Sequence, residues 1–258
     1  MKLILATRNP HKARELAAMF DLGLPVQTLT EIGFQGEIRE DGKTFEENAR
    51  IKLMAVRDFL AKNWPHADLD AFCLIADDSG LEVDALGGAP GVFSARYAGE
   101  ADFGERSRSA NDKANLQKLL REMQGVPGPK RTARFRCVLA AEWVMANVVA
   151  AVDDRRFSLQ TESGGHRPPL QGAIFTGVCE GKIGFRPKGK NGFGYDPVFF
   201  PEGSCRTFAE LSPGEKNRES HRARAAKQLK EWLNLKMAVG NYRIQVEGDS
   251  GSNKSKSW

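Results

Sequence analysis

Two neighbouring carboxylates, Asp77 and Asp78, follow an apolar run in the segment AFCLIADDSG (71–80). The run predicts a buried strand that ends at the aspartates, with a glycine-rich loop after it, and α/β proteins place their sites at such strand ends. Carboxylates there suit Mg²⁺, which binds one or two acidic side chains together with waters and substrate phosphates. Because strand side chains alternate between faces, only one aspartate can face a given site. Aspartates that cap a helix or form a turn are the alternative.

A second acidic pair, Glu40 and Asp41, lies in a polar stretch just before an expected helix. One of these carboxylates could join the same ion, since Mg²⁺ takes oxygen ligands from separate segments. Sequence spacing alone does not separate this interpretation from a solvated acidic turn.

The segment ATRNPHK (6–12) joins an apolar strand pattern to a helix start. Such a turn aims backbone N–H groups and the positive end of the helix dipole at one point, which favours an anion. Thr7 and Asn9 offer further hydrogen bonds, and Arg8 and Lys12 offer positive charge. The P-loop pattern G-x-x-x-x-G-K-[ST] is absent, so a phosphate site and a plain helix start stand as equal alternatives.

Two later segments could hold a nucleoside. KGKNGFGYDP (188–197) places glycines around Phe193 and Tyr195, so the main chain can approach a ligand closely and an aromatic ring can stack on a base. EKNRESHRARA (215–225) is rich in donors, and because arginine donates but never accepts, it would favour a 6-oxo purine over a 6-amino purine. The alternatives are a glycine turn with its aromatics in the core, and a solvated basic helix face.

The bulk composition is typical of a soluble globular protein, with 41% hydrophobic and 28% charged residues in a chain of 258. The longest apolar stretch, 137–152, is interrupted by Glu142 and Asn147 and falls short of the roughly 18 apolar residues that a membrane span needs. The N-terminal apolar run, 3–6, is too short for a signal peptide. We therefore expect a cytoplasmic protein without a membrane partner.

Charge and cysteine content are less specific. The net charge of +5 suits an anionic ligand, but the basic residues are dispersed, which argues against a stable nucleic-acid partner. The four cysteines lie far apart without a C-x-x-C pair, and three of them have apolar, strand-like neighbours. Buried thiols are therefore favoured over metal ligands.

The elements that must position these residues alternate without a strict β-α-β repeat, which predicts an α/β fold with a mixed sheet. A buried strand over 2–7 leads to a helix that Asn9 caps and Pro10 begins. Thr44 and Glu47 form a capping box for a helix over 45–64. Further strands are expected over 26–29, 71–80, 133–146 and 147–152. Further helices are expected over 112–123 and over 215–235, the second with a start signal at 212–215. A long polar loop is expected over 153–172 and a flexible end over 236–258.

The motifs follow one another in a specific order. From the N-terminus they are T-x-N-x-x-K, E-D-G-x-T-F-x-E-N-A, ADDSGLEVDALGGAPGVFSARYAG, GFGYDPVF and E-K-N-x-x-S-H-R. In this series the chain resembles the inosine/xanthosine triphosphate pyrophosphatase family of house-cleaning nucleotide hydrolases. The resemblance implies one domain over 1–235, built on an elongated mixed sheet flanked by helices, with two lobes, a central cleft and a homodimeric state.

The resemblance also implies Mg²⁺-dependent hydrolysis of ITP, dITP and XTP to the monophosphate and pyrophosphate. Glu40 and Asp78 would hold Mg²⁺, Asp78 would also be the base for the attacking water, and Ser79 would contact the substrate. The implied triphosphate-binding residues are Thr7, Arg8, Asn9, Pro10, His11 and Lys12. The implied nucleoside pocket consists of Phe193, which would stack on the base, together with Gly194, Tyr195 and Asp196. The residues implied to bind the edge of the base are Lys216, His221 and Arg222.

Three features depart from the resemblance: Arg8 stands where glycine is frequent, the 153–172 segment is long and polar, and the tail has no counterpart. Two other functions stay open, a pyrophosphatase of similar fold for modified pyrimidine or methylated nucleotides, and a single-strand nucleic-acid module with Phe193 and Tyr195 as stacking platforms. Acidic clusters would repel a phosphate backbone, which argues against the second. The favoured interpretation requires residues 77–79 and 7–12 to share one cleft.

Overall fold

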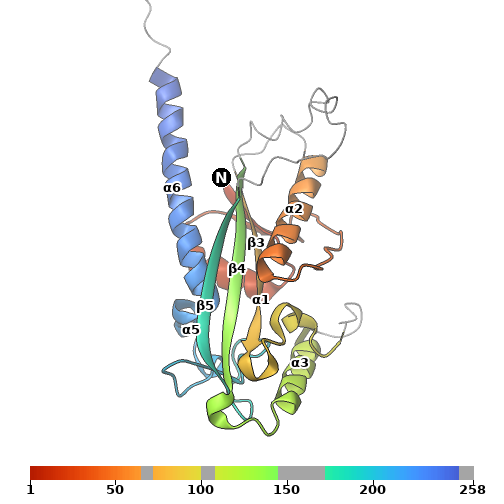
Figure 1. Ribbon diagram of the computed structural model, residues 1–258. Helices are drawn as coiled ribbons and strands as arrows, with labels where there is room; N and C mark the ends of the chain where they lie inside the picture. Colours follow the sequence, from red (N-terminus) through yellow and green to blue (C-terminus); the bar gives the residue numbers. More distant parts are fainter. Residues whose placement is uncertain (65–71, 100–107, 145–171, 250–258) are drawn as a thin grey trace, which may run out of the picture.

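The computed structural model describes residues 1–64, 72–99, 108–144 and 172–249 (Figure 1). One six-stranded sheet runs in the order β2-β1-β3-β4-β5-β6. Its strands are β1 (Lys2–Leu5), β2 (Val26–Thr28), β3 (Phe72–Val83), β4 (Thr132–Val144), β5 (Ala173–Ile183) and β6 (Phe199–Pro201). β1 is parallel to β2 and β3, whereas the pairs from β3 to β6 are antiparallel. The mixed sheet expected from the sequence is confirmed.

Helices cover both faces of this sheet. They are α1 (Pro10–Phe20), α2 (Phe45–Asn63), α3 (Arg108–Glu122), α5 (Pro213–Glu219) and α6 (His221–Asp249). Figure 1 shows α2 and α6 on opposite sides of the long central strands. Strand alternation explains this, since Leu3 and Ile75 pack toward α1 and α6 while Ile4 and Leu74 pack toward α2.

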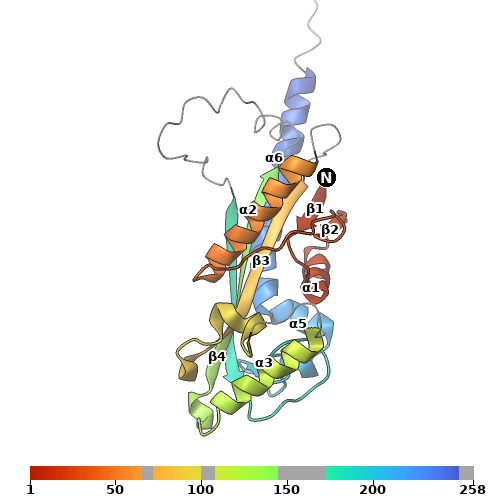
Figure 2. The same ribbon diagram turned by 90° about the vertical axis from the view of Figure 1, so that its right-hand side faces the viewer.

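A second lobe forms around the far ends of β3 and β4. Figure 2 shows α3 there, at the end of the sheet remote from the upper part of α2. Its core joins Leu81 and Val83 of β3 to Leu119 of α3 and to Phe199 and Phe208. The chain therefore has the two lobes that the resemblance implied.

Three helix starts, those of α1, α2 and α5, agree with the sequence prediction. The Asn9 side chain caps α1 with Pro10 in its first turn, and Thr44 and Glu47 form the expected capping box on α2. Ser212 likewise caps α5. Each cap satisfies backbone N–H groups that have no partner inside the helix.

Two predicted element ends are wrong. β3 does not stop at the aspartates but continues to Val83, because β4 pairs with it along its whole length. The expected helix over 215–235 is broken at Ser220, whose backbone is extended and whose hydroxyl accepts from Ala223 N at 3.2 Å, so that α6 begins anew at His221. α6 then runs past 235 to Asp249, through a segment that contains no proline to stop it.

Other expectations have mixed outcomes. α3 begins at Arg108, earlier than predicted. The strand expected over 147–152 and nearly all of the loop over 153–172 lie outside the described residues. Cys73, Cys137 and Cys179 are buried free thiols, as expected. In the part of the chain that the structure describes, no helix combines the length and apolar character needed to cross a membrane.

Candidate active site

The N-terminal turn is held by its own side chains. Asn9 Oδ1 accepts from the backbone N–H groups of His11 and Lys12 at 3.0 and 3.4 Å, and Thr7 Oγ1 accepts from Asn9 N at 3.1 Å. The turn thereby carries Lys12 toward β3, where its Nζ lies 2.5 Å from Asp77 Oδ1. Residues 7–12 and 77–79 therefore meet, as the favoured interpretation required.

Asp77 is the buried centre of this meeting point. Besides Lys12, its carboxylate accepts from Ser79 Oγ at 2.9 Å and from Arg222 Nε at 3.2 Å. Burial alone would raise the pKa of Asp77, but the positive charges of Lys12 and Arg222 outweigh it and hold that pKa well below its ordinary value. The sequence analysis gave Asp77 no separate role, whereas the structure makes it the link between the turn and α6.

Asp78 points to the other face of the sheet, as strand alternation requires. Its Oδ1 lies 2.7 Å from Lys52 Nζ, which also lies 2.9 Å from Glu40 Oε2 and donates to Asp77 O at 3.0 Å. Burial raises the pKa of Asp78, against the opposing charges of Lys52 and Lys12. Burial would lower the pKa of Lys52, but Asp78 and Glu40 outweigh it and raise that pKa. One ammonium thus bridges the two implied metal ligands.

Lys52 was not identified from the sequence, although a signal existed. It lies on the apolar face of α2, between the buried residues Ala49, Leu53 and Val56. A lysine at a core position of an amphipathic helix needs a buried partner, because an unpaired charge is costly there.

The acidic side chains fit a magnesium ion of the kind that keeps most of its waters. Asp78 Oδ2 is buried and has no hydrogen-bond partner among the described residues, and Glu40 lies against the same lysine. Within the described ranges there is no group of three or more His, Cys, Asp or Glu side chains that could hold a metal. Two carboxylates completed by waters and substrate phosphates are typical of Mg²⁺.

β1 ends before the aspartates of β3. β1 pairs with β3 only up to Leu5 and Ile75, whereas Asp77, Asp78 and Ser79 lie farther along, with β4 on their other side. This edge of β3 therefore meets the N-terminal turn in place of a strand. Asp77 and Asp78 lie on opposite faces of the sheet there, and both are buried.

The glycine-rich loop places an aromatic ring against α1. The Phe193 ring stacks on His11, with centroids 5.3 Å apart and planes at 24°. Lys216 Nζ lies 4.7 Å and the Arg222 guanidinium 5.2 Å from the centre of the same ring. Asp196 fixes this arrangement, since its Oδ2 accepts from Phe193 N at 2.8 Å and from Lys216 Nζ at 2.6 Å.

Arg222 and Lys216 share a partner that the sequence analysis missed. Glu15 of α1 accepts from Arg222 Nη1 at 3.1 Å and from Lys216 Nζ at 2.8 Å. Arg222 also donates from Nη2 to Ser79 Oγ at 2.7 Å. Burial would raise the pKa of Glu15, but these two cations lower it. Glu15 stands one turn after Lys12 on α1, so its acidic character was visible but its partners, some 200 residues away in the chain, were not.

His221 is a neutral, buried imidazole at the start of α6. Its ring stacks on Phe135, with centroids 4.7 Å apart and planes at 11°. Burial, together with the charges of Arg222 and Lys216, holds its pKa well below the ordinary value of 6.5. Both ring nitrogens are buried, and neither has a hydrogen-bond partner among the described residues.

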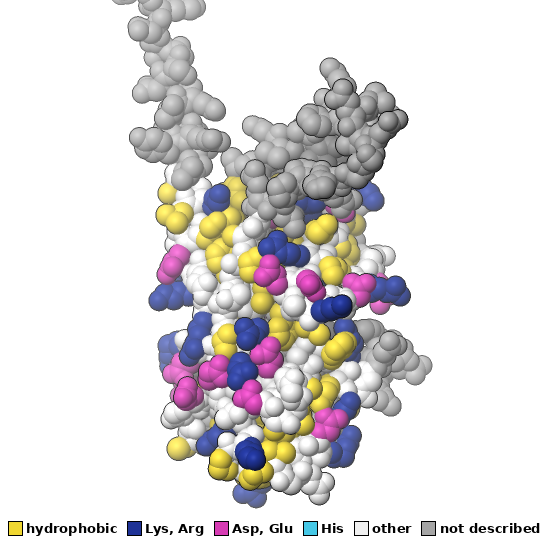
Figure 3. Space-filling view, in the orientation of Figure 1, with side chains coloured by type: hydrophobic (Ala, Val, Ile, Leu, Met, Phe, Trp, Pro, Cys, Tyr) yellow, Lys and Arg dark blue, Asp and Glu magenta, His cyan; other side chains and the backbone are white. Residues whose placement is uncertain are grey.

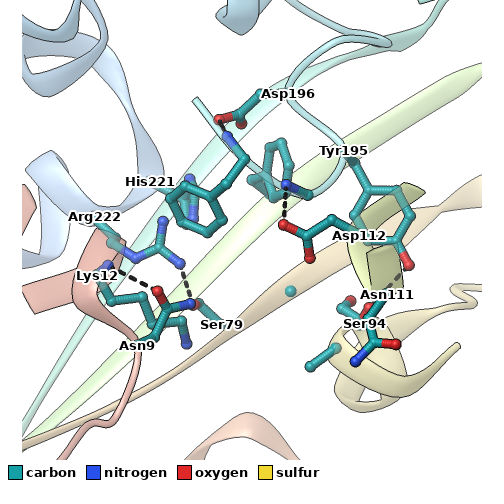
Figure 4. A pocket seen from close by; sticks show the side chains of 15 residues that line it. Asn9, Lys12, Ser79, Ser94, Asn111, Asp112, Tyr195, Asp196, His221 and Arg222 are labelled. Carbon is teal, nitrogen blue, oxygen red and sulfur yellow. Dashed lines mark hydrogen bonds between the residues drawn. The ribbon is translucent and has the colours of Figure 1, made fainter. Parts of the chain in front are cut away.

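These groups line a cavity of about 220 Å³ between the lobes. Figure 4 shows Asn9, Lys12, Ser79 and Arg222 on one side of it, and Asn111, Asp112 and Ser94 on the other. Of the implied site residues, Asn9, Lys12, Ser79, Phe193, Gly194, Tyr195, Asp196, His221 and Arg222 line it, while Thr7, Arg8, Pro10, His11, Glu40, Asp78 and Lys216 do not. The Tyr195 hydroxyl donates to Ser94 O at 2.9 Å and Asp112 accepts from Gly194 N at 3.0 Å, so both brace the loop.

Comparison with known proteins places this site in a family. The model of the Ham1 family matches residues 3–232. A protein of Bacillus licheniformis named dITP/XTP pyrophosphatase is 43% identical over 233 residues, covering 90% of this chain and 97% of its own length. Its namesake in Bacillus subtilis is 41% identical over 231 residues, covering 89% and 96%.

Solved structures agree with the sequence comparison. The Ham1 protein of Staphylococcus aureus is 33% identical with a TM-score of 0.66, covering 92% of this chain and 100% of its own. A HAM1 protein from Coxiella burnetii is 35% identical, also with a TM-score of 0.66, covering 91% and 98%. The resemblance inferred from the motifs is confirmed: the chain belongs to the Ham1 family.

Proposed function

We propose that this protein is a nucleoside triphosphate pyrophosphatase that hydrolyses ITP, dITP and XTP to the monophosphate and pyrophosphate. One observation carries the proposal: the cationic helix start with Lys12, Ser79 on the edge strand and the Phe193 ring meet around one cavity, and the Asp78 carboxylate lies next to Ser79 on the same strand. The dITP/XTP pyrophosphatase names of the relatives support the same substrate class.

The phosphate end is the N-terminal turn. The start of α1 presents the positive end of its dipole, although Asn9 already caps its first N–H groups, and Lys12 adds a full charge beside Asp77. A triphosphate bound there would place its α-phosphorus near the edge of β3. Ser79, which already donates to Asp77, lies on the cavity side of that edge.

The base end would be read by Phe193, His221 and Arg222. The Phe193 ring offers a stacking face, and the unpartnered His221 nitrogens offer one donor and one acceptor in the neutral ring. ITP and XTP present O6 as an acceptor and N1–H as a donor, and both polarities are inverted in ATP. A 6-amino base would leave buried donors unpaired, which lowers its affinity by orders of magnitude.

We further propose that Glu40 and Asp78 hold Mg²⁺, which when bound would supply positive charge to the phosphate oxygens. Asp78 orients the water that attacks the α-phosphorus and takes its proton, while the bond from that phosphorus to the pyrophosphate oxygen breaks. Lys12 stabilises the charge that develops on the phosphate oxygens. Asp77 and Asp196 touch no reacting atom; they hold Lys12, Arg222 and Lys216 in place.

The nucleic-acid alternative finds little support on the surface. Figure 3 shows Lys and Arg side chains interspersed with Asp and Glu over the visible face. A single-strand binding groove instead tracks the backbone with positive charge. Phe193 is stacked on His11, and Tyr195 is buried with its hydroxyl bonded to Ser94, so the two rings do not form an open platform.

A substrate panel tests the proposal. ITP, dITP, XTP, GTP, ATP, dUTP and methylated triphosphates would be incubated with and without Mg²⁺, and pyrophosphate and monophosphate would be measured separately. We expect equimolar pyrophosphate and monophosphate from the deaminated purines only, and only with Mg²⁺. Preference for dUTP or a methylated nucleotide would support the alternative pyrophosphatase. Salt-sensitive oligonucleotide binding without hydrolysis would refute the enzyme assignment.

We also propose that the enzyme is a cytoplasmic homodimer. This assembly and location are implied by the family resemblance and by the composition of the chain. Light scattering behind a sizing column gives the mass in solution, and a monomer at micromolar concentration would refute the dimer.

A further inference from the structure

The segment that carries Glu40 makes few backbone hydrogen bonds, although Ile38 in its middle packs against the core. It joins β2 to α2, and residues 34–42 have no regular secondary structure. Figure 2 shows it running from the β2 side of the sheet to the start of α2. Within the described part of the chain, the backbone of residues 35–41 makes only two hydrogen bonds, both through carbonyl oxygens, those of Gly36 and Glu40. The position of Glu40 therefore depends on a small number of groups.

Three cations make the polar contacts of this segment. Arg96 Nη2 donates to Glu40 O at 2.9 Å, and Lys52 Nζ lies 2.9 Å from the Glu40 carboxylate. Arg8 Nη2 donates to Gly36 O at 2.6 Å and lies 3.4 Å from Phe34 O. Arg96 and Lys52 act at Glu40 itself, whereas Arg8 fixes the chain four residues earlier.

Arg8 is directed at this segment and away from the cavity. Its guanidinium lies 5.8 Å from the centre of the Phe34 ring, and Arg8 does not line the cavity that Asn9 and Lys12 enter. A hydrogen bond from a charged donor is stronger than one between neutral groups. The bond to Gly36 thus ties the triphosphate-binding turn directly to the segment that carries Glu40.

We propose that Arg8 is a positioning residue that sets the Glu40 carboxylate for its metal. The inference rests on the proposed function, since it concerns the metal of that site. Without Arg8, Gly36 O would lose its hydrogen bond, and the stretch up to Glu40 would be held only by the packing of Ile38 and by Arg96 and Lys52 at Glu40 itself. Mg²⁺ demands near-ideal octahedral geometry, so such freedom at one of two protein ligands weakens binding.

The test compares Arg8→Ala with a matched control, Arg39→Ala. Arg39 is an exposed arginine on the same segment, and its side chain makes no hydrogen bond or ion pair in the described structure. Both variants remove one positive charge near Glu40, but only the first removes a bond to the segment. Nuclear magnetic resonance order parameters of the backbone of residues 35–41 in the metal-free protein report the mobility of the segment directly. Titration with Mn²⁺ alone, followed by electron paramagnetic resonance, reports the metal site, and KM for ITP reports substrate binding.

We expect Arg8→Ala to lower the backbone order parameters of residues 35–41 and to weaken Mn²⁺ binding about fivefold, the size expected for one solvent-exposed charge interaction. Arg39→Ala should change neither. Equal behaviour of the two variants would overturn the inference. So would a raised KM for ITP in Arg8→Ala with unchanged order parameters and Mn²⁺ affinity, since Arg8 would then act on the phosphates.

The order-parameter and Mn²⁺ measurements do not depend on catalysis. A wild-type protein that binds Mn²⁺ but hydrolyses no ITP would contradict the proposed function, while the two variants would still decide the role of Arg8. A wild-type protein that binds no Mn²⁺ would overturn the inference itself.

Discussion

Replacing Asp77 with asparagine removes one charge from the centre of the site and keeps the side-chain shape. The carboxylate accepts from Lys12, Ser79 and Arg222 at 2.5, 2.9 and 3.2 Å. The amide retains one accepting oxygen, but its NH₂ group must face Lys12 or Arg222, which only donate. Removing one partner of a buried ion pair costs about 3–5 kcal/mol. We expect about 3 kcal/mol, the lower end of that range, because the Lys12 side chain is 15% exposed and can turn to solvent.

The cost of Asp77→Asn should depend on pH. Because Lys12 and Arg222 hold the pKa of Asp77 below its ordinary value of 3.8, the unfolded chain takes up this proton first as the pH falls. The stabilisation by the carboxylate is therefore fully present above about pH 5 and is lost progressively below it. At pH 3 the difference in unfolding free energy between wild type and variant should be smaller than at pH 7 by about 1 kcal/mol.

Urea unfolding at pH 7 and pH 3 measures both effects, with Asp84→Asn as the control. Asp84 lies just beyond the end of β3 and pairs with Arg134 at 2.9 Å, but its side chain is 42% exposed. A surface pair contributes about 1 kcal/mol or less. Equal losses for the two variants at pH 7, or a loss at Asp77 that does not shrink at pH 3, would refute the reasoning that Asp77 is a buried link.

Two further substitutions test the proposed chemistry. Asp78→Asn should reduce kcat for ITP at saturating Mg²⁺ by about 10²–10⁴-fold, the range for loss of a general base. Circular dichroism should show that the variant keeps its fold. A near wild-type kcat would show that Asp78 is not the base. Arg222→Ala should lower the ratio of kcat/KM for ITP to kcat/KM for ATP by roughly tenfold, since one mispaired buried hydrogen bond costs about 1–3 kcal/mol. The dependence of the rate on Mg²⁺ concentration should change less. An unchanged ratio would show that another group recognises the base.

The sequence predicted the parts of the fold that are set locally. The caps at Asn9, Thr44 and Ser212 are short-range patterns, and each starts a helix where expected. The mixed sheet followed from apolar runs and their order. The convergence of residues 7–12 with 77–79 followed from the motif resemblance together with the rule that sites lie at strand ends.

Contacts between distant segments could not be read in the same way. Glycine and charge around Gly80 suggested the end of a strand, but pairing with β4 carries β3 on to Val83. The alternation of Leu81 and Val83 with Glu82 was the available signal, since period-two patterning predicts a strand. Lys52 and Glu15 were visible as charged residues on helices, but their buried partners come from other parts of the chain.

The early end of β1 has a consequence for how this enzyme tolerates change. Where most sheets would place a neighbouring strand, the middle of β3 meets the N-terminal turn instead, and Lys12 of that turn reaches Asp77 there. If two additional residues prolonged β1, its main chain would pair with β3 beyond Ile75 and occupy the position of the N-terminal turn. Every side chain named above would still be present in the sequence. Catalytic activity in this fold therefore depends on the length of β1 as much as on residue identity. An insertion after Leu5 would reduce activity as much as the loss of a carboxylate.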